Sequence, residues 1–161
     1  FVKELYVWSK LAHENILPLL GYVLEGDYPS VVSEWIENGT VTKYLKHNSS
    51  ADPEKLILGI AAGMDYLHDQ DIVHSDLKAD NVLVGPSSQP LICDFGMSRT
   101  LASSLSIEAT TLSDVRGSVR WMAIELLDIN LDSLHTKETD VWAFGMTVYV
   151  CFSVTFSELR N

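Results

Sequence analysis

Apolar residues recur at helical spacing in two stretches of this chain, residues 1–11 and 53–68. Side chains at i, i+3, i+4 and i+7 share one face of a helix, so both stretches are predicted to be amphipathic helices with one buried stripe. The stripes comprise Phe1, Leu5, Trp8 and Leu11 (or Ala12) in the first helix, and Leu56, Ile60, Gly63, Met64 and Leu67 in the second.

Local signals predict where several elements begin and end. Asp52, Pro53 and Glu54 supply a cap, a proline and an acid for the start of the second helix. Thr40 is expected to cap a short helix that ends near Lys46. Residues 19–24 and 30–36 are apolar runs around a Glu-Gly-Asp turn, and shorter runs occupy 82–84 and 90–93, so two hairpins are predicted.

Residues 141–156 form a run of sixteen without a charge, which has two interpretations. The first is a membrane span, but the run is shorter than a bilayer requires and contains Thr, Ser and Gly. The second, which we favour, is a central helix that is buried on all sides and capped by Asp140.

Composition narrows the class of protein. A chain of 161 residues fits one domain with a real core, and a net charge of −11 argues against a nucleic-acid partner, because phosphate binding needs a basic surface. Cys93 and Cys151 lie in apolar runs, which favours buried free thiols in a reducing compartment, and a cytoplasmic location is expected. No signal peptide opens the sequence, and since it does not begin with methionine we expect the natural start upstream.

The candidate chemistry lies in residues 73–84, VHSDLKADNVLV, and in Asp94-Phe95-Gly96. Asp76 and Asn81 stand five positions apart between two apolar runs, and Asp94 ends the next strand, where Gly96 is expected to free the backbone to turn. One carboxylate that accepts a hydroxyl proton, with an amide and a second carboxylate that hold a hard cation, forms a set suited to phosphoryl transfer.

Both motifs, in this order, resemble the H-R-D-L-x-x-x-N and D-F-G motifs of eukaryotic protein kinases. The N-terminal pattern F-x-x-E-x-x-x-W-x-x-L-x-H-x-N-I-L and the later GSVRWMA resemble the tyrosine-kinase-like branch, serine/threonine type. The resemblance implies a truncated α+β fold. Residues 1–36 would form a partial small lobe (helix C, strands four and five, the start of the hinge), and residues 37–161 the mostly helical first part of the large lobe.

By this resemblance, Asp76 would orient and deprotonate the substrate hydroxyl and Lys78 would steady the transferring phosphate. Asn81 and Asp94 would hold magnesium. The implied cofactors are ATP and Mg²⁺, and the implied partner is a protein that carries Ser or Thr, with no membrane span. A serine/threonine substrate is favoured by Lys78 and Ser118.

The resemblance also implies residues around ATP. Glu4 would pair with the lysine that grips ATP, and Ser33 would be the gatekeeper. Glu34 and Ile36 would belong to the hinge that bonds the adenine, and Leu83 would lie beneath it.

Other residues are implied to have structural or regulatory roles. His74 would pack under Phe95, in a stack with Trp8 and Leu19, and would not act as a base. Asp140 would bond back to the catalytic loop. Residues 97–115, rich in Ser and Thr, are interpreted either as a flexible linker or, by the resemblance, as an activation loop that phosphorylation can order.

The sequence departs from the family pattern in several places. The glycine-rich loop, its lysine and the late helices of the large lobe have no counterpart in the sequence, so strands four and five are expected to expose an open edge. Ser75 replaces the arginine before the catalytic aspartate, and Ile124 replaces the proline of A-P-E. Glu125 lacks its arginine partner and would be either unpaired or solvated.

Three functional hypotheses follow. The first is a serine/threonine protein kinase fragment that transfers the γ-phosphate of ATP, weakly or not at all as the isolated chain. The second is a pseudokinase-like interaction module, which the departures favour and the intact Asp76, Asn81 and Asp94 disfavour. The third is a nonfunctional remnant that folds poorly because of its open edges.

Overall fold

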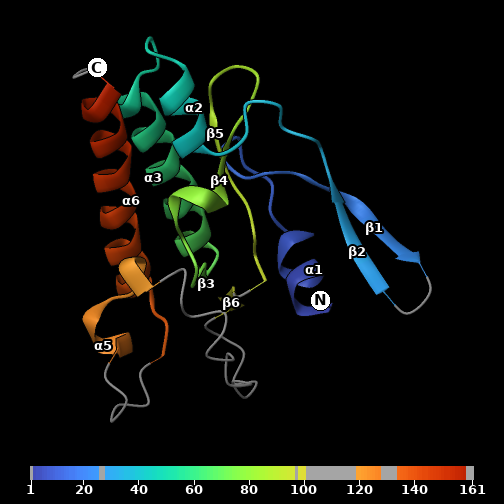
Figure 1. Ribbon diagram of the computed structural model, residues 1–161. Coiled ribbons are helices and arrows are strands. Elements are labelled where there is room, and N and C mark those ends of the chain that lie inside the picture. Colours follow the sequence, from blue (N-terminus) through green and yellow to red (C-terminus); the bar gives the residue numbers. More distant parts are fainter. Residues whose placement is uncertain (1, 26–27, 97, 101–118, 128–133, 159–161) are drawn as a thin grey trace.

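The computed structural model describes residues 2–25, 28–96, 98–100, 119–127 and 134–158 (Figure 1). The chain has the predicted mixture of helices and short strands. Its helices are α1 (Val2–Trp8), α2 (Val41–His47), α3 (Pro53–Asp69), α5 (Ile124–Leu127) and α6 (Lys137–Glu158), with 3-10 turns at Ala79–Asn81 and Val119–Trp121. Its strands are β1 (Leu19–Glu25), β2 (Tyr28–Ser33), β3 (Ile72–Val73), β4 (Val82–Val84), β5 (Pro90–Ile92) and β6 (Arg99–Thr100).

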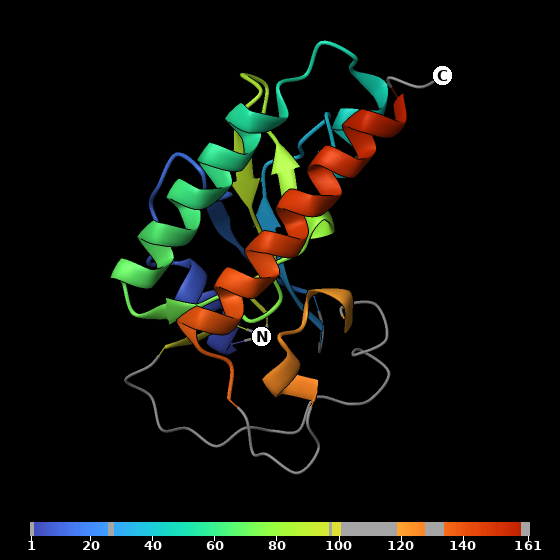
Figure 2. The ribbon, with the colours of Figure 1, turned by 90° about the vertical axis from the view of Figure 1, so that its left-hand side faces the viewer.

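Helices α3 and α6 lie side by side, and the β4–β5 hairpin lies behind them (Figure 2). Helix α2 packs against α6 near the C-terminal end of α6 (Figure 1). The described strands form three antiparallel pairs, β1–β2, β3–β6 and β4–β5. The β1–β2 hairpin projects on the side away from α6 (Figure 1).

Helix α3 follows its sequence signals closely. The Asp52 side chain accepts hydrogen bonds from the backbone N–H groups of Glu54 and Lys55, which satisfies two of the unpaired donors at the helix start. All five residues of the predicted stripe are buried. Thr40 likewise caps α2 by accepting from the Lys43 N–H at 3.3 Å. These predictions are confirmed.

The first helix is shorter than predicted, but Trp8 and Leu11 of its predicted stripe are buried. Helix α1 ends at Trp8, and Val7, Trp8 and Leu11 are buried whereas Ala12 is exposed. The Trp8 indole Nε1–H donates to the Leu17 carbonyl at 2.6 Å, so the helix end is tied to the segment that leads into β1. The side chains of Phe1 and Glu4 lie outside the described residues.

The β1–β2 hairpin has the predicted strands, with Tyr22 opposite Val31, although β2 ends at Ser33 and not at Ile36. Within the described residues this sheet has two strands. Leu20 and Leu24 are each about two-thirds exposed. The expected open sheet is therefore present in the part of the chain that the structure describes.

Two predictions about α6 are wrong. The helix begins at Lys137, and its cap is Thr136, whose hydroxyl accepts from the Thr139 N–H while the Thr139 hydroxyl accepts from the Thr136 N–H. Asp140 therefore lies one turn inside the helix. The helix is also not buried on all sides, because Val141 and Tyr149 are at least 60% exposed.

The exposed face of α6 bears on the membrane question. Residues 137–156 are long and apolar enough to cross a bilayer by length and composition, with a mean hydropathy of 1.2, and 28% of the apolar window is buried within the chain. A single helix of this kind is weak evidence and does not establish a membrane span.

Most of the predicted activation loop, residues 97 and 101–115, lies outside the described residues. Its first described part is ordered: Arg99 and Thr100 form β6 opposite Val73 and Ile72. Ser98 is buried, and its hydroxyl donates to the His74 carbonyl at 3.2 Å.

Two helical glycines give a test of this packing. A Cβ at Gly59 would lie 2.5 Å from the rigid Pro90 ring and 2.9 Å from Asn15 Nδ2, whereas a Cβ at Gly145 would meet nothing within 4 Å. We expect Gly59→Ala to lower the free energy of unfolding by about 1–3 kcal/mol. Gly145→Ala should raise it by about 0.5–1 kcal/mol, because alanine costs less backbone entropy in a helix. Urea unfolding measures both, and shifts of the same sign would contradict the packing.

Candidate active site

The loop between β3 and β4 brings together three of the predicted site residues. Lys78 Nζ lies 2.7 Å from Asp76 Oδ2, and Asn81 Nδ2 donates to the same oxygen at 3.1 Å and to the Asp76 carbonyl at 2.9 Å. The Asp76 carboxylate is thus held by two donors and is still about one-fifth exposed. The loop fixes the carboxylate and leaves part of it accessible.

The orientation of Asn81 bears on cation binding. Its amide nitrogen is committed to Asp76, which leaves its amide oxygen as the atom that could ligate a hard cation. The backbone carbonyl of Asn81 accepts from the Cys93 N–H at 3.0 Å and from the Cys93 thiol at 3.3 Å, so the residue before Asp94 is joined to the loop.

Asp94 is exposed and stands in the left-handed backbone region, with φ of 65°. The turn expected at Gly96 stays a prediction, and the left-handed residue described in this motif is Asp94 itself. An aspartate in this region is uncommon and costs conformational energy.

Oxygen donors suit magnesium, which binds through one or two carboxylates together with phosphate oxygens. Within the described residues, no three His, Cys, Asp or Glu side chains are grouped as a complete metal site. A cation held by the Asn81 amide oxygen and the Asp94 carboxylate would therefore need further oxygen ligands, such as those of a phosphate.

A buried carboxylate anchors the start of the loop. Asp140 is 1% exposed and accepts from the His74 N–H at 2.8 Å, the Ser75 N–H at 2.9 Å and His68 Nε2 at 3.0 Å. The predicted bond from Asp140 back to the loop is confirmed. His68 as its third partner was missed, because nothing in the spacing of residues 68 and 140 indicates that they meet.

The same carboxylate stabilises an unusual backbone. Ser75 has φ of 72°, which is rare for residues other than glycine, asparagine and aspartate. Its N–H is aimed at Asp140 in this conformation, immediately before Asp76. The position of Asp76 therefore depends on a hydrogen bond that Ser75 donates to a helix residue 65 positions away in the sequence.

His74 packs and does not act as a base. It is fully buried, and its ring centroid lies 5.4 Å from that of Phe95, which lies 5.6 Å from that of Trp8. Nδ1 accepts from the Asp76 N–H, so Nε2 carries the hydrogen and donates to the Cys93 carbonyl. Burial lowers the pKa of His74 below its usual 6.5, against the smaller opposing effect of nearby Asp140.

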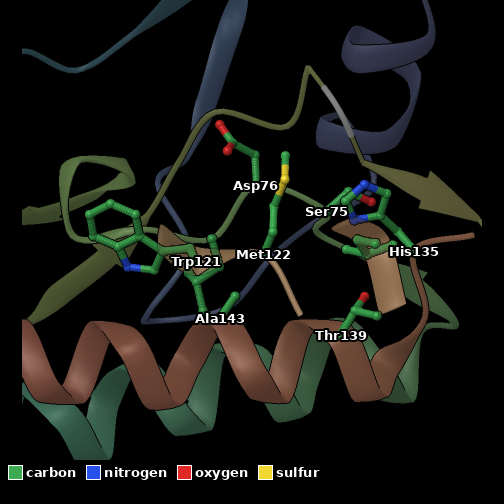
Figure 3. Close-up of a pocket in the computed structure, with 9 residues that line it drawn as sticks. Ser75, Asp76, Trp121, Met122, His135, Thr139 and Ala143 are labelled. Carbon is green, nitrogen blue, oxygen red and sulfur yellow. The ribbon is translucent and has the colours of Figure 1, made fainter. Parts of the chain in front are cut away.

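A small pocket opens beside Asp76, between the loop and α6 (Figure 3). Its volume of about 20 Å³ suits a single water molecule. The Ser75 hydroxyl is buried and has no hydrogen-bond partner among the described residues. The lining residues are Ser75, Asp76, Leu77, Trp121, Met122, Leu126, His135, Thr139 and Ala143.

The residues predicted around ATP lie in two places. Ile36 is buried and Leu83 half-buried, and Thr40, four residues after Ile36, forms a β-bridge with Leu83. Ser33 is half-buried and Glu34 exposed, at the end of β2. The Glu4 side chain, as noted, lies outside the described residues.

The structure also describes the two cysteines and Glu125, for which the sequence predicted free thiols and an unpaired or solvated carboxylate. Cys93 and Cys151 are free thiols, and burial raises their pKa to about 12 and about 11, so both are poor nucleophiles. Glu125 is exposed, so it is solvated and not left as a buried unpaired charge.

Comparison with known proteins places these motifs in context. The family model "protein tyrosine and serine/threonine kinase" matches residues 1–160. Rust resistance kinase Lr10 of Triticum aestivum is 36% identical over 160 residues, which cover 92% of this chain and 25% of that protein. A leaf rust 10 disease-resistance locus receptor-like protein kinase-like protein (2.1) of Arabidopsis thaliana is 32% identical over 169 residues, covering 100% and 26% respectively. The chain thus spans about a quarter of the length of these relatives.

The neutral state of His74 predicts a pH dependence of stability. Below pH 6.5 the unfolded chain binds a proton that the folded protein does not, so the free energy of unfolding should fall as pH is lowered through that value and be independent of His74 above it. The contribution reaches at most about 1.4 kcal/mol per pH unit. Urea unfolding from pH 5 to 8 should show a shallower slope for His74→Phe, which keeps a buried ring.

His47 provides the matched control, because it is exposed on α2. His47→Gln should leave the slope as in the wild type. An unchanged slope in His74→Phe would contradict the assignment of a buried neutral imidazole.

Proposed function

The chain belongs to the protein tyrosine and serine/threonine kinase family, and from this we propose that it supplies the catalytic loop for transfer of the γ-phosphate of ATP to serine and threonine hydroxyls of proteins. The observation that carries the proposal is the Asp76 carboxylate, partly exposed and held by Lys78 and Asn81. A fixed carboxylate with a cation beside it suits a reaction that depends on positioning and electrostatics.

In the proposed reaction, Asp76 accepts a hydrogen bond from the substrate hydroxyl and takes its proton as the oxygen attacks the γ-phosphorus. The bond from that phosphorus to the bridging oxygen breaks, and ADP leaves with the electron pair. Lys78, 2.7 Å from Asp76, stabilises charge on the transferring group. Bound Mg²⁺ would neutralise phosphate charge, and the Asn81 amide oxygen and the Asp94 carboxylate would hold it.

The adenine is proposed to lie over Leu83 and against the hinge that contains Ile36, and the Thr40–Leu83 bridge joins the segment after that hinge to Leu83. Ser33 and Glu34 would border the base, and Glu4 would pair with the lysine that grips ATP. This proposal divides the chain into a partial small lobe, residues 1–36, and a partial large lobe, residues 37–161. Free thiols and the use of ATP are consistent with the proposed cytoplasmic location.

Nucleotide binding is the first test. A ligand that binds only the folded state raises apparent stability, so saturating ATP with Mg²⁺ should raise the melting temperature by several degrees. Asp94→Asn should remove most of the shift, because a neutral amide holds the cation more weakly. Asp65→Asn, an exposed change of equal charge on α3, is the control and should retain the shift. No shift in the wild type would contradict a nucleotide site in this chain.

Phosphotransfer is the second test. Asp76→Asn preserves shape but removes the proton acceptor, so kcat on a serine peptide should fall about 10²–10⁴-fold. Asp80→Asn, exposed in the same loop, should retain most of the activity. If the wild-type chain bound nucleotide but transferred no phosphate, an interaction module would be the better description.

A further inference from the structure

A side-chain hydrogen bond joins the segment around Trp121 to α6. The Trp121 indole Nε1–H donates to Thr147 Oγ1 at 3.2 Å, and that hydroxyl donates to the Ala143 carbonyl one turn earlier at 3.0 Å. Thr147 is fully buried. Its hydroxyl hydrogen is committed to Ala143, so a lone pair is what it offers to Trp121.

Trp121 belongs to the surroundings of Asp76 in the proposed site. It lines the same pocket as Asp76, and Figure 3 shows Trp121 and Met122 between Asp76 and the helix that carries Ala143. A hydroxyl that gives its proton to Asp76 must come within about 3 Å of the carboxylate. Trp121 and Met122 form a wall of the pocket beside this carboxylate, which makes them candidate contacts of the substrate chain.

We infer that Thr147 is a positioning residue for the protein substrate, because through the Trp121 indole it fixes the wall of the pocket beside Asp76. The inference rests on the proposed function. Thr147 touches neither the hydroxyl nor the nucleotide, so its effect falls on the binding of the phosphate acceptor and not on ATP. Without the threonine acceptor, the indole N–H in this partly buried site loses its partner and the ring no longer has one preferred orientation.

Helix α6 offers a matched control. Thr155 makes the same hydrogen bond to the carbonyl four residues earlier, from Oγ1 to Cys151 at 3.0 Å. Thr147→Val and Thr155→Val therefore remove the same hydroxyl and the same helical bond, but only the first removes the acceptor of Trp121. Trp121→Phe removes the donor and keeps an aromatic wall, and Thr147→Ser keeps the acceptor.

The test compares steady-state kinetics of the full chain with a serine peptide. Thr147→Val and Trp121→Phe should each raise the KM for peptide about five- to tenfold, the factor that one neutral hydrogen bond represents, with kcat and the KM for ATP nearly unchanged. The double variant should be no worse than either single one, because both remove the same interaction. Thr155→Val and Thr147→Ser should retain the wild-type KM.

Amide hydrogen exchange of residues 119–127 gives a readout that does not require activity. Exchange there should be faster in Thr147→Val than in Thr155→Val. Equal exchange in the two variants, a uniform loss of all kinetic parameters, or an unchanged KM for peptide would each overturn the inference. A wild-type chain without phosphotransfer would overturn the proposed function instead, and the exchange comparison would still decide whether Thr147 holds the wall.

Discussion

The rest of the site depends on the hydrogen bonds that the buried Asp140 carboxylate accepts. A buried charge is costly unless hydrogen bonds replace its lost solvation, and Asp140 has donors from His68, His74 and Ser75. These donors come from the end of α3 and from the loop after β3, so one side chain joins three segments. The left-handed backbone at Ser75 is stable because this acceptor offsets its conformational cost.

A second set of contacts, centred on His74, fixes the other side of the loop that contains Asp76. His74 packs against Phe95, and Phe95 against Trp8, whose indole is bonded to the Leu17 carbonyl. Because the neutral His74 ring accepts from the Asp76 N–H and donates to the Cys93 carbonyl, it connects the two motifs directly. Protonation would leave a buried cation and break the first of these bonds, which is why the ring is suited to packing and not to proton transfer.

The errors of sequence interpretation have definite physical causes. An uncharged run reports apolar content, but it does not say which faces find a neighbour, so Val141 and Tyr149 on α6 are exposed although the run suggested complete burial. Asp140 and Thr136 are both good helix caps by residue type. Thr136 is the cap in the structure, because the Asp140 carboxylate accepts hydrogen bonds from the catalytic-loop segment and not from its own helix. The left-handed backbone at Asp94 is a further feature that residue type did not predict, because aspartate itself disfavours this conformation.

The sequence by itself determined the family, the fold class and the chemical set of Asp76, Lys78, Asn81 and Asp94, since caps, periodicity and short motifs are local and depend on neighbouring residues. It also determined α3 with its buried stripe, because a helical face is fixed by spacing alone. Only the tertiary structure decided how the set is held. The partners of Asp140, the tautomer of His74 and the bond from Trp121 to Thr147 join residues far apart in the chain, and no local pattern encodes such distances.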